Sequence, residues 1–267
     1  MAEQFVKFTT TSGVGVITLD RPEARNALTP EMVRQLGQAV ASCKRPDIRA
    51  VLMTGSGGAF CAGADVKGLV ETLENEGPEA LSQSIRELAG ALHTDVVLPL
   101  RRLNRPVVAG IQGAAAGAGF SLALAADLRV AAQNARFLMA YANIGAPADG
   151  GSTYLLPRLV GTGRAMEFYL ASQPIGAPRA LEVGLVNQVC PDDELDRHAL
   201  ETTVRLAQGP TVAYGRMKEL YEGSWSSDLE SQLESETEAI ASVALTSDFQ
   251  EGIKAFAGRR QPWFQGK

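Results

Sequence analysis

The sequence predicts an α/β fold with a helical C-terminal region, and three observations support this prediction. Short β-rich segments alternate with helical segments over the first two thirds of the chain, which is typical of an α/β core. The last quarter is helical in pattern. The chain of 267 residues, 45% hydrophobic and 21% charged, is long enough for one large domain with an appendage. We therefore expect a core domain over residues 1–195 and a helical region over residues 196–267.

The first predicted elements are a hairpin and a helix. Phe5–Thr10 and Val14–Leu19 are β-rich segments joined by a Ser-Gly turn, which predicts two paired strands. A helix is expected from Pro30 to about Cys43, because Thr29 can cap it and a proline and a glutamate open its first turn. The chain is thus expected to begin strand, strand, helix.

Strands and helices continue to alternate through the middle of the chain. Arg49–Thr54 is a short β-branched segment that predicts a strand, and residues 60–70 form a loop that enters a helix. Residues 79–103 repeat apolar side chains with a helical period. Pro106–Gln112 is expected to form a buried strand, and residues 117–126, rich in small side chains, a helix.

The C-terminal part is predicted to be mainly helical. Leu128–Ala131 is the last strand expected before Gly150, and Leu185–Val189 is the one short strand expected after it. From Asp192 onward the pattern is helix and turn, including an acidic amphipathic segment over residues 227–242. Such a helical tail has little core of its own, so we expect it to pack on another subunit.

Composition excludes several classes of function. The net charge of −5 and pI near 5.2 argue against nucleic acid or an anionic membrane as the main partner. The N-terminal segment does not have the pattern of a signal peptide, and no apolar run is long enough for a membrane span. Cys43, Cys61 and Cys190 are widely spaced, which indicates reduced thiols in a cytoplasmic protein. His93 and His198 stand alone, so no metal site is expected, and His93 shows no partner that would make it catalytic.

Two corners rich in glycine and alanine, residues 61–65 and 113–119, each lead into a predicted helix. Helix N-termini present unpaired N–H groups, and small residues let a ligand approach the backbone closely. If the two corners face each other, they supply a pair of donors for an oxyanion. The alternative is that residues 117–126 are simply a tightly packed buried helix. A dinucleotide fingerprint is excluded because Leu122 occupies its third glycine position.

One acidic side chain, Asp149, lies among Gly, Ala, Pro and Ile in the stretch AYANIGAPADGGSTYLLPRL, residues 140–159. A surface turn explains the pattern, because Pro-x-Asp-Gly-Gly is ordinary turn chemistry. The alternative is a carboxyl group held in an apolar pocket, where it can transfer protons.

Four segments, in this order, resemble the enoyl-CoA hydratase/isomerase (crotonase) superfamily. They are residues 19–28 (LDRPEARNAL), 60–65 (FCAGAD), 105–119 (RPVVAGIQGAAAGAG) and 161–186, and residues 251–256 (EGIKAF) are also similar. The resemblance implies a crotonase-like spiral of ββα units with a helical C-terminal trimerisation element. It also implies an acyl-CoA thioester as substrate, no metal or redox cofactor, and a homotrimer or a dimer of trimers.

The resemblance further implies roles for individual residues. The backbone amides of Ala64 and Ala118 would hold the thioester oxygen as it gains enolate charge, and such a donor is typically worth roughly 2.7–4 kcal/mol. Arg25 and Lys67 either pair with the CoA phosphates or are solvated surface cations, and Asp65 is expected to cap its helix. The implied substrate- and CoA-binding residues are Arg25, Ala27, Ala62, Ala64, Asp65, Lys67, Gly117 and Tyr141, with Tyr141 as a pocket wall.

The chain departs from the hydratase pattern at two positions. Hydratase members resemble one another in carrying two glutamates, and the equivalent positions here are Ser121 and Tyr141. Neither is a useful base near neutral pH, since the reference pKa of tyrosine is about 10. Asp149 falls where isomerase-type members place an acid, as in the 3,2-enoyl-CoA isomerases and the epoxyphenylacetyl-CoA isomerases of phenylacetate breakdown. Pro147 lies one place earlier than the corresponding proline in those isomerases.

The predicted function is therefore acyl-CoA double-bond isomerisation, in fatty acid or phenylacetate metabolism, with Asp149 moving the proton. Three alternatives stay open. The chain could be an enoyl-CoA hydratase, or an acyl-CoA hydrolase or dehalogenase with Asp149 as nucleophile. It could also be a CoA-binding paralogue without catalysis.

Overall fold

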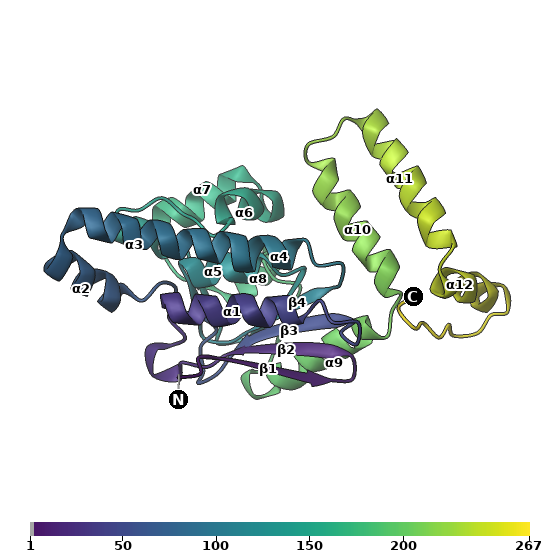
Figure 1. The fold of residues 1–267 in the computed structure, drawn as a ribbon, viewed down its shortest axis with the longest axis horizontal. Coiled ribbons are helices and arrows are strands. Elements are labelled where there is room, and N and C mark those ends of the chain that lie inside the picture. The colour runs from purple at the N-terminus through teal and green to yellow at the C-terminus, as the bar shows by residue number, and fades with distance from the viewer. Residues whose placement is uncertain (1–2) are drawn as a thin grey trace.

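The computed structural model describes residues 3–267, and a six-stranded sheet forms its centre (Figure 1). β1 and β2 form an antiparallel hairpin, and the remaining neighbours in the order β1-β2-β3-β4-β6-β9 are parallel. The strands are β1 (Val6–Thr11), β2 (Val14–Leu19), β3 (Ala50–Gly55), β4 (Val107–Ile111), β6 (Leu128–Ala132) and β9 (Gln188–Cys190). The predicted hairpin and the three strands expected between residues 49 and 131 are confirmed.

A second, three-stranded sheet contains β5 (Ala114–Ala116), β7 (Arg136–Leu138) and β8 (Ile175–Gly176). Consecutive strands divide between the two sheets, β4 then β5 and β6 then β7, and helices follow each pair, as the expected spiral of ββα units requires. The small sheet was not predicted from the sequence, and the strand expected at Leu185–Val189 begins later, at Gln188. Strands of two or three residues are too short to show an alternating pattern.

Helices cover both faces of the large sheet (Figure 1). α1 packs on β1 and β2, while α9 packs on β3, β4 and β6, and each face has its own buried apolar cluster. Thr29 caps α1 as predicted, since its hydroxyl accepts a hydrogen bond from the Met32 amide at 3.2 Å. The helices over the core are α1 (Pro30–Ser42), α2 (Val66–Glu76), α3 (Pro78–Ala91), α4 (Leu98–Arg101), α5 (Ala118–Leu124), α6 (Ser152–Val160), α7 (Thr162–Ala171), α8 (Ala177–Glu182) and α9 (Leu195–Ala207).

Three C-terminal helices form an arm on the opposite side of the molecule from α2 (Figure 1). They are α10 (Thr211–Ser224), α11 (Leu229–Ala244) and α12 (Ser247–Ala257). The arm begins later than residue 196, because Leu195, Ala199 and Ala207 of α9 are buried against the sheet. Within residues 3–267, no helix combines the length and apolar character needed to cross a bilayer.

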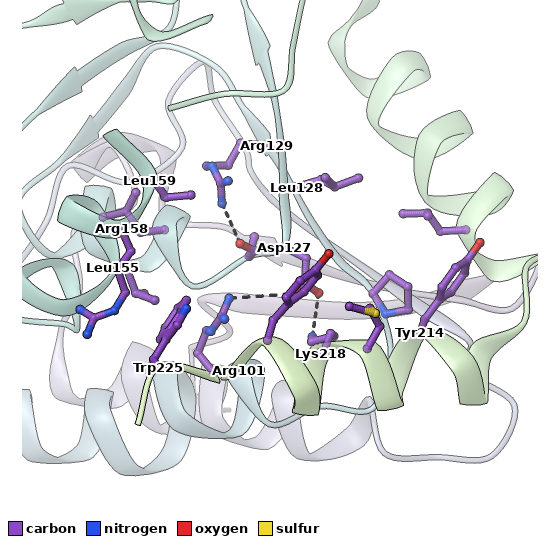
Figure 2. Close-up of a pocket in the computed structure, with 16 residues that line it drawn as sticks. Arg101, Asp127, Leu128, Arg129, Leu155, Arg158, Leu159, Tyr214, Lys218 and Trp225 are labelled. Carbon is purple, nitrogen blue, oxygen red and sulfur yellow. Dashed lines mark hydrogen bonds and ion pairs between the residues drawn. The ribbon is translucent and has the colours of Figure 1, made fainter. Parts of the chain in front are cut away.

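A groove of about 480 Å³ separates the start of the arm from the core (Figure 2). Lys218 of α10 donates a hydrogen bond to Asp127 at 2.7 Å, and Arg101 of α4 lies 3.7 Å from the same carboxylate. At the other end, the Arg158 guanidinium of α6 lies 4.9 Å from the ring centroid of Trp225. The charged groups of the groove thus fix α10 to the core.

Candidate active site

A buried asparagine shapes the first glycine-alanine corner. The Asn26 side chain is fully buried, and its Nδ2 atom lies 3.0, 2.8 and 3.3 Å from the carbonyl oxygens of Ser56, Ala59 and Phe60. Its Oδ1 atom accepts from the Arg21 amide at 2.8 Å. One amide therefore joins the loop after β2 to the loop after β3. Asn26 could not be singled out from the sequence, because three of its four partners lie thirty or more positions away.

The two corners lie side by side, as the oxyanion hypothesis requires. Cys61 forms a parallel bridge with Ala115, with hydrogen bonds of 2.9 Å on either side of it. A Cβ atom added at Gly63 would lie 3.5 Å from the amide nitrogen of Ala118. The contact is closest at Gly119, where an added Cβ would lie 2.2 Å from the carbonyl oxygen of Cys61. The first corner and the N-terminus of α5 are thus in direct backbone contact.

The amides of Ala64 and Ala118 have no hydrogen-bond acceptor among residues 3–267. Ala118 is the first residue of α5, so its N–H has no partner within the helix. Around Ala64, the Gly63 carbonyl and the Asp65 amide both bond to Leu28, at 2.7 and 3.0 Å. Because successive amides of an extended chain point to opposite sides, the N–H of Ala64 points away from Leu28.

Ala64 and Ala118 both line a cavity of about 380 Å³. Asp149 and Tyr141 are the ionisable groups among its lining residues, and its other walls are mostly apolar. Besides these two, the cavity is lined by Leu28, Ala62, Gly63, Ala64, Val66, Leu69, Ile85, Leu88, Ala89, Leu92, Gly117, Ala118, Ala140, Ile144, Ala146, Pro147 and Ala148. The cavity is therefore of a size and character that suit an apolar ligand group, with one carboxylate in its wall.

The carboxylate of Asp149 belongs to a chain of hydrogen bonds. The hydroxyl of Tyr141 donates to Asp149 Oδ1 at 2.5 Å, and Ser121 Oγ lies 2.9 Å from the same hydroxyl oxygen. Burial, followed by the charge of Asp149 and the hydrogen bond to it, raises the pKa of Tyr141 above its usual value, so the phenol keeps its proton. Tyr141 therefore does more than form a pocket wall, because it contacts the candidate acid directly.

The backbone after Asp149 is held by a histidine. His93 lies in a π-helical turn, η2 (Leu92–Val97), and its Nε2 atom accepts from the Gly150 amide at 3.0 Å. This corrects the expectation that His93 has no partner. An added Cβ at Gly150 would lie 2.6 Å from the Cβ of Ser121, so the loop that carries Asp149 passes directly over α5. Neither contact could be predicted from the sequence, since His93 and Gly150 are 57 positions apart.

The other predicted binding residues lie at the first corner. Asp65 caps α2 as expected, accepting from the Lys67 amide at 3.2 Å, and it pairs with Arg21 at 2.7 Å. Burial acts to raise the pKa of Asp65, but the Arg21 guanidinium outweighs it and holds the pKa below its usual range. Arg25 and Lys67 are exposed, with no ion pair among the residues that the structure describes. Ala27 is buried.

The site residues were also checked for a cysteine nucleophile and for a group of metal ligands. Burial raises the pKa of the Cys61 thiol to about 12, so it is not a nucleophile near neutral pH, and its Sγ donates to the Asn26 carbonyl at 3.1 Å. Within the described part of the chain, no group of three or more His, Cys, Asp or Glu side chains is arranged to hold a metal ion.

Comparisons of the sequence and of the structure with known proteins find relatives of one family. Residues 9–267 match the family model described as Enoyl-CoA hydratase/isomerase. A Rhodobacter capsulatus protein named as a probable enoyl-CoA hydratase is 38% identical over 100% of both chains, and the 1,2-epoxyphenylacetyl-CoA isomerase of Escherichia coli is 34% identical over 99% of both. The crystal structure of an enoyl-CoA hydratase from Bacillus anthracis has a TM-score of 0.90 and 31% identity, covering 99% of this chain and 100% of that chain. Relatives named for hydration and for isomerisation thus occur at similar identity.

Proposed function

The chain belongs to the enoyl-CoA hydratase/isomerase family, and within it we propose that this protein is an acyl-CoA double-bond isomerase. The observation that supports this choice is the single carboxylate at the cavity. Asp149 borders the same cavity as the amides of Ala64 and Ala118, while Ser121 and Tyr141 form a hydrogen-bonded pair beside it.

The proposed reaction moves one proton and no other atom. In a 3-enoyl thioester, Asp149 takes a proton from C2, and the electron pair delocalises into the thioester carbonyl. The N–H groups of Ala64 and Ala118 stabilise the resulting dienolate oxygen. The carboxyl group then returns the proton to C4, giving the 2-enoyl isomer. Both proton transfers use the same carboxyl group, and the proposal requires no metal or redox cofactor.

Hydration makes a different demand on the site. Water must be oriented and deprotonated while a proton is delivered to carbon, which is work for two acid–base groups. The hydroxyl of Tyr141 is engaged with Asp149 at 2.5 Å, and its raised pKa keeps it protonated near neutral pH, so it cannot take a proton from water. The site therefore supports one-carboxylate chemistry better than hydration, although some relatives are named as hydratases.

An isotope experiment tests the proposal. The protein is incubated with 3-enoyl-CoA and, separately, 2-enoyl-CoA in deuterated water. We expect the double bond to migrate, with deuterium entering the substrate, and mass spectrometry and NMR measure both. Formation of 3-hydroxyacyl-CoA as the main product would replace the proposal by a hydratase. Release of free CoA with an acylated protein would indicate Asp149 as a nucleophile, and binding without any reaction would indicate a non-catalytic paralogue.

We also propose that Arg25 and Lys67 bind the phosphates of CoA. Both side chains are exposed beside the first corner, whose amide at Ala64 is proposed to hold the thioester. Planar guanidinium and point-charge ammonium groups are both suitable partners for phosphate. Their free charges in a chain of net charge −5 support this role.

A homotrimer, or a dimer of trimers, is proposed as the assembly. The arm leaves large apolar side chains in solvent, among them Leu229, Leu245 and Phe256, which are 74, 83 and 89% exposed. A single chain cannot cover this surface, whereas a symmetric oligomer can.

Light scattering tests the proposed assembly. The wild-type protein is expected to have three or six times the chain mass of 28.3 kDa. Phe256→Asp should shift the mass toward the monomer, because it places a charge at an apolar contact, while Glu236→Ala, an exposed polar position on α11, should not. A wild-type protein that stays monomeric at micromolar concentration contradicts the proposed assembly.

A further inference from the structure

The carboxylate of Asp149 has two oxygens in different surroundings. Oδ1 accepts the hydroxyl of Tyr141 at 2.5 Å, whereas Oδ2 has no hydrogen-bond partner among residues 3–267. The two oxygens are equivalent in a free carboxylate, but here one is engaged with protein and the other is left for the substrate.

The number of available hydrogens determines which group donates in each hydrogen bond among Ser121, Tyr141 and Asp149. The carboxylate has no hydrogen to give, so the phenol of Tyr141 is the donor in the 2.5 Å contact. The phenol oxygen can then accept the hydroxyl hydrogen of Ser121, 2.9 Å away. The other acceptor for that hydrogen, the Gly117 carbonyl, is more distant at 3.3 Å. Ser121, Tyr141 and Asp149 thus form a relay with one polarity.

Burial and hydrogen bonds hold the residues of this relay in place. Tyr141 is buried at 8% exposure in the short 3-10 helix η3 (Ala140–Ile144), and Ser121 is fully buried in α5. The segment between η3 and Asp149 is held independently, because the hydroxyl of Tyr169 in α7 donates to the Ala146 carbonyl at 3.1 Å. The phenol therefore has a fixed position from which to orient the carboxylate.

We propose that Tyr141 is a positioning residue for Asp149. By holding Oδ1, the phenol directs Oδ2 into the cavity, so that the proton of the reaction is taken up and returned by one defined oxygen. Ser121 supports the phenol from behind. This inference rests on the proposed isomerase function, and it assigns Tyr141 a role beyond that of a pocket wall.

Three substitutions test the proposal in the isotope assay. Tyr141→Phe keeps the ring and removes the donor, Ser121→Ala removes only the support of the phenol, and Tyr169→Phe is the matched control. The hydroxyl of Tyr169 also holds the loop before Asp149, by donating to the backbone carbonyl of Ala146. Removing this hydroxyl loosens the loop but leaves the hydrogen bond to the Asp149 carboxylate in place.

For Tyr141→Phe we expect kcat to fall by about 10- to 100-fold with KM changed little. A loss in kcat without a matching change in KM is expected because the ring of Tyr141 stays in the cavity wall and only the hydrogen bond that orients Asp149 is removed. Ser121→Ala should lower kcat by less, and Tyr169→Phe should leave kcat and KM close to their wild-type values.

The outcomes separate this inference from the proposed function. If the wild-type protein catalyses neither migration nor exchange, the isomerase proposal fails. If the wild type is active but Tyr141→Phe keeps the wild-type kcat, or Tyr169→Phe lowers kcat equally, Tyr141 has a merely structural role and the inference is overturned.

Discussion

Replacing Asp149 by asparagine is expected to abolish double-bond migration and deuterium exchange while leaving acyl-CoA binding intact. The amide has nearly the shape of the carboxylate and can still accept the hydroxyl of Tyr141, so the loop should keep its conformation. An amide cannot take a proton from carbon near neutral pH. General acid–base groups typically contribute on the order of 10²–10⁴-fold to a rate, and here one group serves both proton transfers, so the loss should reach at least that range.

Asp193→Asn is the matched control for this experiment. Asp193 is exposed in a short turn before α9, far in sequence from the cavity residues, and its replacement should leave the rate unchanged. Rates are measured from the NMR signals of the vinyl protons, and affinity from titration with a saturated acyl-CoA. Retention of more than about a tenth of the wild-type exchange rate by Asp149→Asn would remove Asp149 from the role of proton shuttle.

The sequence predicted the parts of the site that depend on local backbone structure. The two corners were identified because small residues precede helices there, and the helix cap at Thr29 was identified from residue type and spacing. The predicted contact between the corners is also present, through the Cys61–Ala115 bridge. These features follow from turn and helix chemistry over a few residues.

Side-chain contacts with groups distant in sequence could not be predicted. Asn26 bonds to carbonyls more than thirty positions away, and His93 bonds to the amide of Gly150 57 positions away. The hydrogen bond between Tyr141 and Asp149 spans eight positions and depends on the 3-10 turn between them. Periodicity carries no information on such pairs, because they are set by how the elements pack.

The fold does not decide between isomerase and hydratase. A relative named as a hydratase is 38% identical and a relative named as an isomerase is 34% identical, both over essentially the whole chain. A shared architecture supports many activities, so the choice must come from the site. Here it depends on which side chains accompany the two amides, and one carboxylate held by a tyrosine is the feature that matters.

The contact between the two corners leads to the second large effect, which is expected for Gly119→Ala. An added Cβ would lie 2.2 Å from the Cys61 carbonyl oxygen and 2.7 Å from the Cys61 Cβ. Neither atom is the end of a flexible side chain, so the first corner and α5 must move apart. Overpacking in a well-packed core costs about 1–3 kcal/mol and sometimes more. At about 2–4 °C per kcal/mol for a chain of this size, Tm should fall by roughly 2–12 °C.

The same displacement should reduce activity, because it changes the distance between the amides of Ala64 and Ala118. Loss of one oxyanion donor costs about 10²–10³-fold in kcat. We therefore expect Gly119→Ala to lower kcat about 100-fold, with deuterium exchange falling in parallel since both depend on enolate formation. A stability defect alone, without this fall at temperatures well below the new Tm, would argue against the two amides acting together.

Gly163→Ala provides a matched control with the opposite expected sign. Gly163 lies in α7, and an added Cβ there would meet no atom within 4 Å. Alanine is favoured over glycine within a helix by up to about 1 kcal/mol, so this variant should be equal to the wild type or slightly more stable, with unchanged kcat. The two substitutions make the same chemical change, and only the close approach of Cys61 to α5 distinguishes them. If both variants melt together with the wild type, the two corners are not in contact, and the pairing of Ala64 with Ala118 as oxyanion donors has no physical basis.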